Sequence, residues 1–399
     1  MARRGGGGVL AAVVLAMGLA AGGGGGAAAA QEQVEKRVFE GGAYQTRGGG
    51  AIANVRVGYQ TMGRLNEAGD NAVLIAHFFS GNSHAFGRLG GANGPVGYWD
   101  AIIGPGKPID TDRFFVVSSD TLVNVNVGDP NTTTTGPATL NPDTGRPYGM
   151  AFPVVSMRDF VEVQKKLLDS LGVKRLALVA GPSNGGLQAI EWAAAYPEII
   201  DRVMPVIAGE IDAWMQGWLD IWEAPIRLDP NWREGDYYGA GREPPLRGLA
   251  ESWKIVTLQA NDRPWTRQFE RKVPEGQDPA KRIGDRFEVE RALDAAGQAR
   301  ARTSDANSFL YMVRANQLAL REYPSMEAAL SRSRARWLVI PAPTDRVFLR
   351  EGVQEMVDIL RRSGRPVEVA EVGGERGHLN GVLNMAPLGE RVRAFLKAD

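Results

Sequence analysis

Residues 176–186 read Leu-Ala-Leu-Val-Ala-Gly-Pro-Ser-Asn-Gly-Gly, and this stretch decides the fold. A short apolar run stops at a Gly-x-Ser-x-Gly centred on Ser183, and a run typical of a helix, 187–196, follows. This is the pattern of a nucleophile elbow, in which a strand turns sharply into a helix and projects the serine hydroxyl. Gly181 and Gly185 lack the Cβ atoms that would clash there. Ser183 is therefore the candidate nucleophile; the competing interpretation is an incidental serine in a Gly-rich turn.

Short apolar runs alternate with helical stretches on both sides of the elbow. The runs typical of buried strands are 73–77, 114–117, 203–207, 337–340 and 367–372. Apolar residues at helical spacing occur over 160–171 and 351–362. The predicted fold class is therefore α/β, with a mostly parallel sheet covered by helices on both faces.

A different pattern occupies residues 210–324, with few strand-like runs, many charges and breaks such as Glu243-Pro244-Pro245. The sheet pattern then resumes at Arg336. We therefore predict a helical cap over 210–324, inserted into a body formed by 34–209 and 325–399, rather than a domain that folds separately.

Three tryptophans of the predicted cap, Trp214, Trp218 and Trp222, are spaced by four and share one helix face. This stripe either docks the cap on the body or forms an aromatic wall of a substrate pocket, which makes Trp218 and Trp222 candidate substrate contacts. The Thr-, Asn-, Pro- and Gly-rich loop 126–149 is too long for a simple connector, so it is either functional or disordered.

Composition excludes several classes of function. Lys plus Arg and Asp plus Glu both number 46, and a net charge of zero gives no reason to expect nucleic acid or an anionic membrane as partner. No cysteine is present, which removes disulfides and thiolate chemistry. The three histidines are His77, His84 and His378, so we predict no metal site and no cofactor.

The N-terminus predicts export. Arg3 and Arg4 precede an apolar run, 9–21, and Ala28-Ala29-Ala30 fits a small-x-small cleavage site. The apolar run is too short to span a bilayer comfortably, so we predict a cleaved signal peptide over 1–30 and a periplasmic or secreted protein with no membrane span after cleavage. The alternative is a disordered Gly/Ala tail.

A serine nucleophile needs a base and a carboxylate that orients the base. Asp345 follows the strand 337–340, and His378 lies in a Gly-rich loop after the last strand. Because the carboxyl ends of parallel strands share one edge, Ser183, Asp345 and His378 are expected to converge. They also have the chain order of elbow enzymes, nucleophile, acid and then base.

Two backbone N–H groups are the predicted oxyanion-hole donors. One belongs to Phe79, in the run 77–81 that follows an early strand, and the other to Asn184, directly after the nucleophile. His77 and His84 are expected to be structural, since neither is needed as the base.

The sequence resembles the homoserine O-acetyltransferase family of α/β-hydrolases. Matching strings include Gly97-Tyr98-Trp99-Asp100, Thr135-Gly136-Pro137, Asp229-Pro230-Asn231-Trp232 and Asp305-Ala306-Asn307-Ser308, and the match covers about 38–395. The resemblance implies an α/β-hydrolase fold, a triad at Ser183, Asp345 and His378, and a homodimer formed through the cap.

Three departures concern the substrate. In the acetyltransferases an aspartate follows the catalytic histidine and is expected to hold the homoserine ammonium, whereas Leu379 stands here. The arginine expected to pair with the homoserine carboxylate is replaced by Glu223, although Arg227, one helical turn further on, is a candidate substitute. Export would also separate the enzyme from cytoplasmic coenzyme A thioesters.

We therefore predict an exported serine enzyme that works through an acyl-Ser183 intermediate and hydrolyses a small ester or acyl compound. The alternative is homoserine O-acetyltransfer with acetyl-CoA as co-substrate, and a third possibility is a non-catalytic binding protein on the same fold.

Overall fold

The computed structural model describes residues 32–91 and 93–397. The predicted signal peptide, 1–30, lies outside the described residues. Among the described residues, no helix combines the length and the apolar character that crossing a membrane requires.

One eight-stranded sheet organises the body, in the order β14-β13-β12-β11-β4-β8-β3-β2. Its strands are β2 (Arg37–Gln45), β3 (Ala51–Met62), β4 (Ala72–Ala76), β8 (Phe115–Ser119), β11 (Leu176–Pro182), β12 (Arg202–Val206), β13 (Arg336–Val339) and β14 (Val367–Val369). From β8 to β14 neighbouring strands are parallel, and the mostly parallel sheet predicted from the sequence is confirmed. The antiparallel β2–β3 hairpin at the other edge was not among the predicted strands.

Short two-stranded pairings form outside this sheet. They are β1 (Gln33–Val34) with β5 (Arg88–Leu89), β6 (Ile103–Gly104) with β7 (Ile109–Asp110), and β9 (Leu140–Asn141) with β10 (Arg146–Pro147). The helices are α1 (Met157–Ser170), α2 (Asn184–Ala195), α3 (Ala213–Leu228), α4 (Leu246–Ala260), α5 (Arg263–Arg267), α6 (Glu288–Ala301), α7 (Ala306–Gln317), α8 (Met326–Leu330), α9 (Arg350–Arg362), α10 (Asn380–Leu383) and α11 (Gly389–Lys397). Single 3-10 turns are η1 (Gly149–Ala151), η2 (Arg233–Gly235), η3 (Gly377–Leu379) and η4 (Ala386–Leu388).

Alternate side chains of the central strands enter two separate apolar cores, one on each face of the sheet. Leu74 and Val179 belong to the core that also contains the buried faces of α1, α2 and α9. Val73 and Leu178 point to the opposite core, which α10 and α11 help to form. Both faces are therefore covered, which explains why these strands read as continuous apolar runs.

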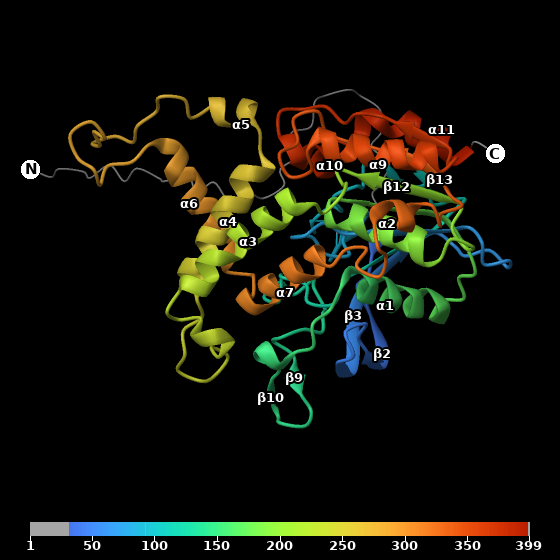
Figure 1. Cartoon of the computed structure of the whole chain (residues 1–399), viewed down its shortest axis with the longest axis horizontal. Helices are drawn as coiled ribbons and strands as arrows, with labels where there is room; N and C mark the ends of the chain where they lie inside the picture. Colours follow the sequence, from blue (N-terminus) through green and yellow to red (C-terminus); the bar gives the residue numbers. More distant parts are fainter. Residues whose placement is uncertain (1–31, 92, 398–399) are drawn as a thin grey trace, which may run out of the picture.

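Helices α3 to α7 lie between β12 and β13 in the chain, and α3 to α6 stand to one side of the body (Figure 1). Their apolar side chains do not form a core of their own. Trp222, Trp253 and Phe309 belong to the same buried cluster as Phe79 and Leu187 of the body. The cap therefore packs as a continuation of one body core.

Helix α1 is tied to the β2–β3 hairpin by one buried carboxylate, that of Asp159. Asp159 accepts hydrogen bonds from the N–H and hydroxyl of Ser156 (2.7 and 2.8 Å), which completes a capping box at the helix start. Its other oxygen accepts from the Tyr44 hydroxyl (2.7 Å) and from the Arg47 N–H (2.8 Å). The Asp159 carboxylate thus accepts four hydrogen bonds, two from Ser156 at the start of α1 and two from Tyr44 and Arg47 of the hairpin segment.

We expect Asp159→Ala to lower the free energy of unfolding by about 3 kcal/mol, because it leaves several buried donors without an acceptor. Urea unfolding measures this change. Asp169→Ala, at the exposed end of the same helix, is the matched control and should change stability by less than about 0.5 kcal/mol. Equal losses in the two variants would contradict the assignment.

Candidate active site

The elbow places Ser183 between β11 and α2 in a backbone conformation that non-glycine residues rarely adopt, with φ 56° and ψ −120°. Close packing around it requires glycine. A Cβ on Gly185 would lie 2.1 Å from the carbonyl oxygen of Ala76, and one on Gly181 would lie 2.4 Å from the same atom. The Ser183 N–H donates to the carbonyl oxygen of Val206 (2.8 Å), which fixes the turn to the neighbouring strand β12.

Ser183, His378 and Asp345 converge as the sequence predicted. The hydroxyl oxygen of Ser183 lies 2.8 Å from His378 Nε2, and His378 Nδ1 lies 2.8 Å from Asp345 Oδ2. All three side chains are buried. With Nδ1–H donating to the carboxylate, Nε2 is the acceptor that faces the serine hydroxyl, which is the tautomer a general base needs.

Local hydrogen bonds orient the carboxylate of Asp345. The backbone N–H groups of Val347 and Phe348 donate to its Oδ1 at 2.7 and 3.1 Å, so Oδ2 is directed to His378. Asp345 lies in the loop after β13, and His378 lies in η3, which follows β14. Adjacent parallel strands therefore deliver the acid and the base to the same edge of the sheet.

Both predicted oxyanion-hole donors lie near this edge. Asn184 is the first residue of α2, where N–H groups lack intrahelical acceptors and the helix dipole favours negative charge. Among the described residues, neither the Asn184 N–H nor the Phe79 N–H donates to a protein acceptor. Both N–H groups are therefore chemically available to a developing oxyanion.

His77 fixes the peptide group that carries the Phe79 N–H. Its Nε2 accepts from the Thr121 N–H (3.2 Å), so its Nδ1–H donates to the carbonyl oxygen of Phe78 (2.8 Å). Burial lowers the pKa of His77, which favours the neutral ring that this pattern requires. In a trans peptide, C=O and N–H point in opposite directions, so holding the Phe78 carbonyl also aims the Phe79 N–H.

The start of the long loop 126–149 holds the same segment. Asn126 Nδ2 donates to the carbonyl oxygens of Ser80 (3.0 Å) and Gly81 (3.1 Å), and Asn124 Nδ2 donates to Gly81 as well (3.0 Å). The sequence left open whether this long loop was functional or disordered. Its position after β8, whose carboxyl end meets the same sheet edge, is the signal that connects it with the site.

We expect Asn126→Leu to lower kcat for ester turnover about tenfold, because the segment 77–81 loses the amide that fixes two of its carbonyl groups. KM should change little, since the side chain does not touch Ser183. Steady-state kinetics on a p-nitrophenyl ester measure both constants. Asn141→Leu, in the β9–β10 hairpin, is the control and should leave kcat unchanged; equal effects would argue against this role for the loop.

Of the cap candidates, Trp222 reaches the site. Its ring packs edge-on against Phe79, with centroids 5.5 Å apart, and its Nε1–H donates to Gln259 Oε1 at 2.6 Å. Trp218 packs instead against Trp214, which is 55% exposed. The stripe therefore runs from solvent into the core, with Trp222 at its buried end.

Arg227, the candidate substitute for the family's arginine, is paired with Glu223, which stands at that arginine's position. Its guanidinium lies 2.9 Å from Glu223 Oε1 and stacks over the ring of Trp232. Burial raises the pKa of Glu223, and Arg227 opposes this shift. Because the pair neutralises itself, it offers no net positive charge to a substrate carboxylate.

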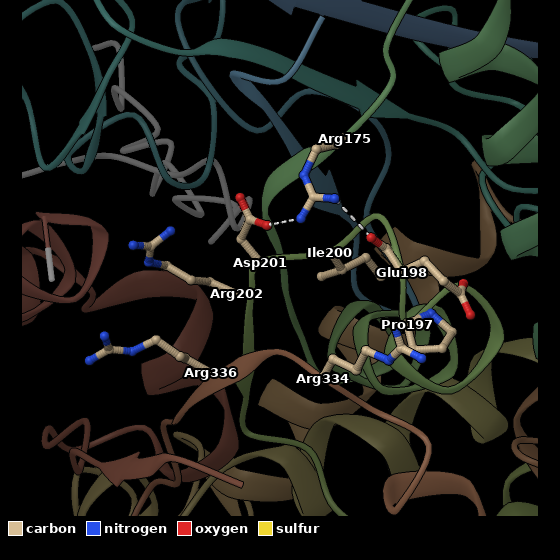
Figure 2. A pocket seen from close by; sticks show the side chains of 8 residues that line it. All are labelled: Arg175, Pro197, Glu198, Ile200, Asp201, Arg202, Arg334 and Arg336. Carbon is tan, nitrogen blue, oxygen red and sulfur yellow. Dashed lines mark hydrogen bonds and ion pairs between the residues drawn. The ribbon is translucent and has the colours of Figure 1, made fainter. Parts of the chain in front are cut away.

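An arginine-rich hollow of about 540 Å³ lies elsewhere on the body (Figure 2). Arg175, Asp201 and Arg336 line it, and they stand at the amino ends of β11, β12 and β13. The triad lies at the opposite edge of the sheet, at the carboxyl ends of β11, β13 and β14. This hollow is therefore separate from the candidate active site. In the described residues, no group of three His, Cys, Asp or Glu side chains is arranged to hold a metal ion.

The fold and the site define the class of protein. Residues 107–355 match the family model for the alpha/beta hydrolase fold. The homoserine O-acetyltransferase of Symbiobacterium thermophilum is 37% identical over 88% of this chain and 90% of that protein, and the enzyme of Moorella thermoacetica is 34% identical over 88% and 92%.

Solved structures agree. Homoserine O-acetyltransferase from Bacillus anthracis is 33% identical, with a TM-score of 0.87, over 92% of this chain and 99% of that chain. Esterase E22 is 44% identical, with the same TM-score, over 91% of this chain and 100% of that chain. This chain belongs to the homoserine O-acetyltransferase family of the α/β-hydrolase superfamily.

Proposed function

We propose that this protein transfers acyl groups through a covalent acyl-Ser183 intermediate. The observation that supports the proposal is the continuous hydrogen-bonded chain from Ser183 through His378 to Asp345, with 2.8 Å at each step. Such a chain lets the hydroxyl lose its proton to the imidazole as it attacks a carbonyl carbon.

The steps follow from the positions of the groups. Ser183 Oγ attacks the acyl carbon while His378 Nε2 takes its proton, and Asp345 stabilises the imidazolium that forms. The N–H groups of Phe79 and Asn184 bind the oxyanion. His378 then protonates the leaving group, and the same residues act in reverse when the second acceptor attacks the acyl-enzyme.

The second acceptor is either water or homoserine. The curated relatives favour homoserine, since the enzymes of Symbiobacterium and Moorella carry that name, and taken alone they support acetyl transfer better than ester hydrolysis. This candidate keeps acetyl-CoA as co-substrate.

The side chains at the acceptor positions favour water. Leu379 has no charge with which to hold an ammonium group, and Glu223 is neutralised by Arg227. The match to esterase E22 agrees with this reading. From the chemistry of the site we propose hydrolysis of a small ester as the main activity, with homoserine acetyl transfer as the second candidate.

We expect a fluorophosphonate probe to label Ser183 and no other residue of the folded protein, since only an activated serine attacks phosphorus at a useful rate. Ser183→Ala should lose labelling and should lower kcat by about 10⁴-fold or more. Intact-mass and peptide mass spectrometry locate the adduct. Ser170→Ala, on the exposed side of α1, is the control and should label normally; an unlabelled wild-type protein would sink the mechanism.

The acceptor is determined in one assay that follows both products. An acetyl ester and acetyl-CoA are each supplied with and without homoserine, and acetate and O-acetylhomoserine are quantified together. Acetate as the main product in the presence of homoserine supports hydrolysis, whereas O-acetylhomoserine formed from acetyl-CoA establishes the second candidate. Ligand binding that is equal in wild type and Ser183→Ala, without turnover, would instead indicate a binding protein.

We also propose that two copies of the chain associate through α3. Trp214, Ile221 and Leu228 are exposed and spaced by seven, so they lie on one side of this helix. Covering such a strip removes apolar surface from water. Leu228→Glu should therefore shift the protein from dimer to monomer in analytical ultracentrifugation, whereas Ile283→Glu, an exposed apolar residue outside α3, should not. A monomeric wild type would refute the proposal.

Export stays a prediction, and the comparisons give it no support. The mass of the mature N-terminus in the periplasmic and cytoplasmic fractions decides it. A chain that begins at Gln31 outside the cytoplasm is the expected result, and retention of Met1 or Ala2 in the cytoplasmic fraction would refute it.

A further inference from the structure

The carboxyl-terminal end of cap helix α4 lies against two loops. We call the loop after β13, which carries Asp345, the acid loop, and the loop after β14, which carries His378, the base loop. Three polar residues at this helix end, Gln259, Asn261 and Asp262, are buried, with 6%, 3% and 3% of their surface exposed. Buried polar side chains require partners, and each of these three has one partner in the two loops. We refer to Gln259, Asn261 and Asp262 as the α4 end.

The α4 end holds the acid loop on both sides of Asp345. The Thr344 hydroxyl, one residue before Asp345, donates to Asp262 Oδ2 at 2.8 Å. Gln259 Nε2 donates to the carbonyl oxygen of Arg346, one residue after Asp345, at 3.1 Å. Two hydrogen bonds from the cap therefore bracket the residue that orients the base.

The same segment holds the base loop. Arg376 Nε, two residues before His378, donates to Asn261 Oδ1 at 2.9 Å. At Gly377, where φ is 55°, an added Cβ would lie 3.2 Å from the Asp262 backbone nitrogen. Burial lowers the pKa of Arg376, and the charge of Asp262 opposes this shift. The base loop thus lies directly on the α4 end.

We propose that the α4 end sets the spacing of the acid and base loops, and that Asn261 and Asp262 are positioning residues for the reaction. Asp345 and His378 come from separate loops, so their 2.8 Å contact requires the two loops to keep a fixed separation. The backbone donors of Asp345 at 347 and 348 belong to its own loop and do not reach the base loop. The α4 end contacts both loops and spans the gap. This inference rests on the proposed function.

The main test compares Asp262→Ala with Asp262→Asn. Alanine removes the partner of Thr344, whereas asparagine keeps an acceptor for the Trp265 N–H that caps α5 and a polar group beside Thr344. Asp262→Ala should lower kcat on the order of tenfold with KM within about twofold, since a small misplacement of catalytic groups is costly while substrate contacts remain. Asp262→Asn should recover most of kcat.

Two further variants guard against a folding defect. Thr344→Val removes the partner hydroxyl from an exposed loop residue and should lower kcat several-fold in the same direction. Thr257→Val removes a hydroxyl from α4 itself, where Thr257 Oγ1 donates to the carbonyl oxygen of Trp253 and to neither loop, and it keeps the carbonyl oxygen that accepts from Asn261 Nδ2. It is the matched control and should keep wild-type kcat.

A spectroscopic readout tests the positioning directly and needs no turnover. The ring Nδ1–H proton of His378, assigned by its loss in His378→Ala, should be a sharp downfield resonance in the wild type, because it donates to a carboxylate. It should broaden or move upfield in Asp262→Ala and Thr344→Val, and stay in Thr257→Val. An unchanged resonance, with wild-type kcat in both loop-contact variants, would overturn the proposal.

Failure of the proposed function would give a different result from failure of this inference. In that case the wild type shows no Ser183-dependent turnover of any ester or thioester, whatever the variants do. The His378 resonance then still reports whether the α4 end sets the contact between Asp345 and His378.

Discussion

The structure depends on how closely α2 approaches the end of β4. The backbone around Ser183 can turn with positive φ because Gly181 and Gly185 leave room for the carbonyl oxygen of Ala76. A non-glycine residue in such a conformation costs on the order of 1–3 kcal/mol. Burial of all of β11 and nearly all of α2 offsets this cost, because the apolar surface that the two elements bury stabilises the folded turn. One steric constraint thus fixes the nucleophile, the helix N-terminus beside it and the neighbouring strand.

Phe79, Asp345 and His378 lie on three loops that meet beside Ser183, and the cap contacts each of these loops. Trp222 of the cap packs on Phe79, and Arg300 of α6 donates to the hydroxyl of Ser80 at 2.8 Å. The α4 end, Gln259, Asn261 and Asp262, reaches the acid and base loops. A cap that shares its core with the body and holds the loops is part of the active-site framework. This explains why its packing cannot be treated as that of a separate domain.

The sequence predicted the parts of this arrangement that local pattern encodes. Strand runs, the helix before the elbow, and the order of Ser183, Asp345 and His378 follow from periodicity and from the rule that parallel strands end at one edge. The hydrogen bonds that hold the loops of the site could not be predicted, because they join residues that are far apart in the sequence. Thr344 and Asp262 are 82 positions apart and Asn126 and Ser80 are 46 apart, and neither pair leaves a periodic signal. In the edge hairpin β2–β3, β2 is mostly exposed and its pairing with β3 is bulged. The hairpin therefore lacks the continuous apolar runs that mark the central strands, and it was missed for that reason.

In the proposed function, the choice of acceptor depends on the charges around Ser183 rather than on Ser183 itself. Any acyl-Ser183 intermediate is open to water unless a better-held alcohol arrives first, so transfer requires the protein to bind that alcohol. Homoserine presents an ammonium and a carboxylate, and a site that recognises it must supply an opposite charge for each. Here Leu379 supplies none, and Arg227 is already occupied by Glu223, 2.9 Å away. Freeing that arginine would leave the buried carboxylate of Glu223 without its partner, which is costly, so the pair resists recruitment by a substrate. The proposed hydrolysis therefore separates acyl chemistry from acceptor binding: the triad is kept, while Leu379 and the Glu223–Arg227 pair supply no free charge for homoserine.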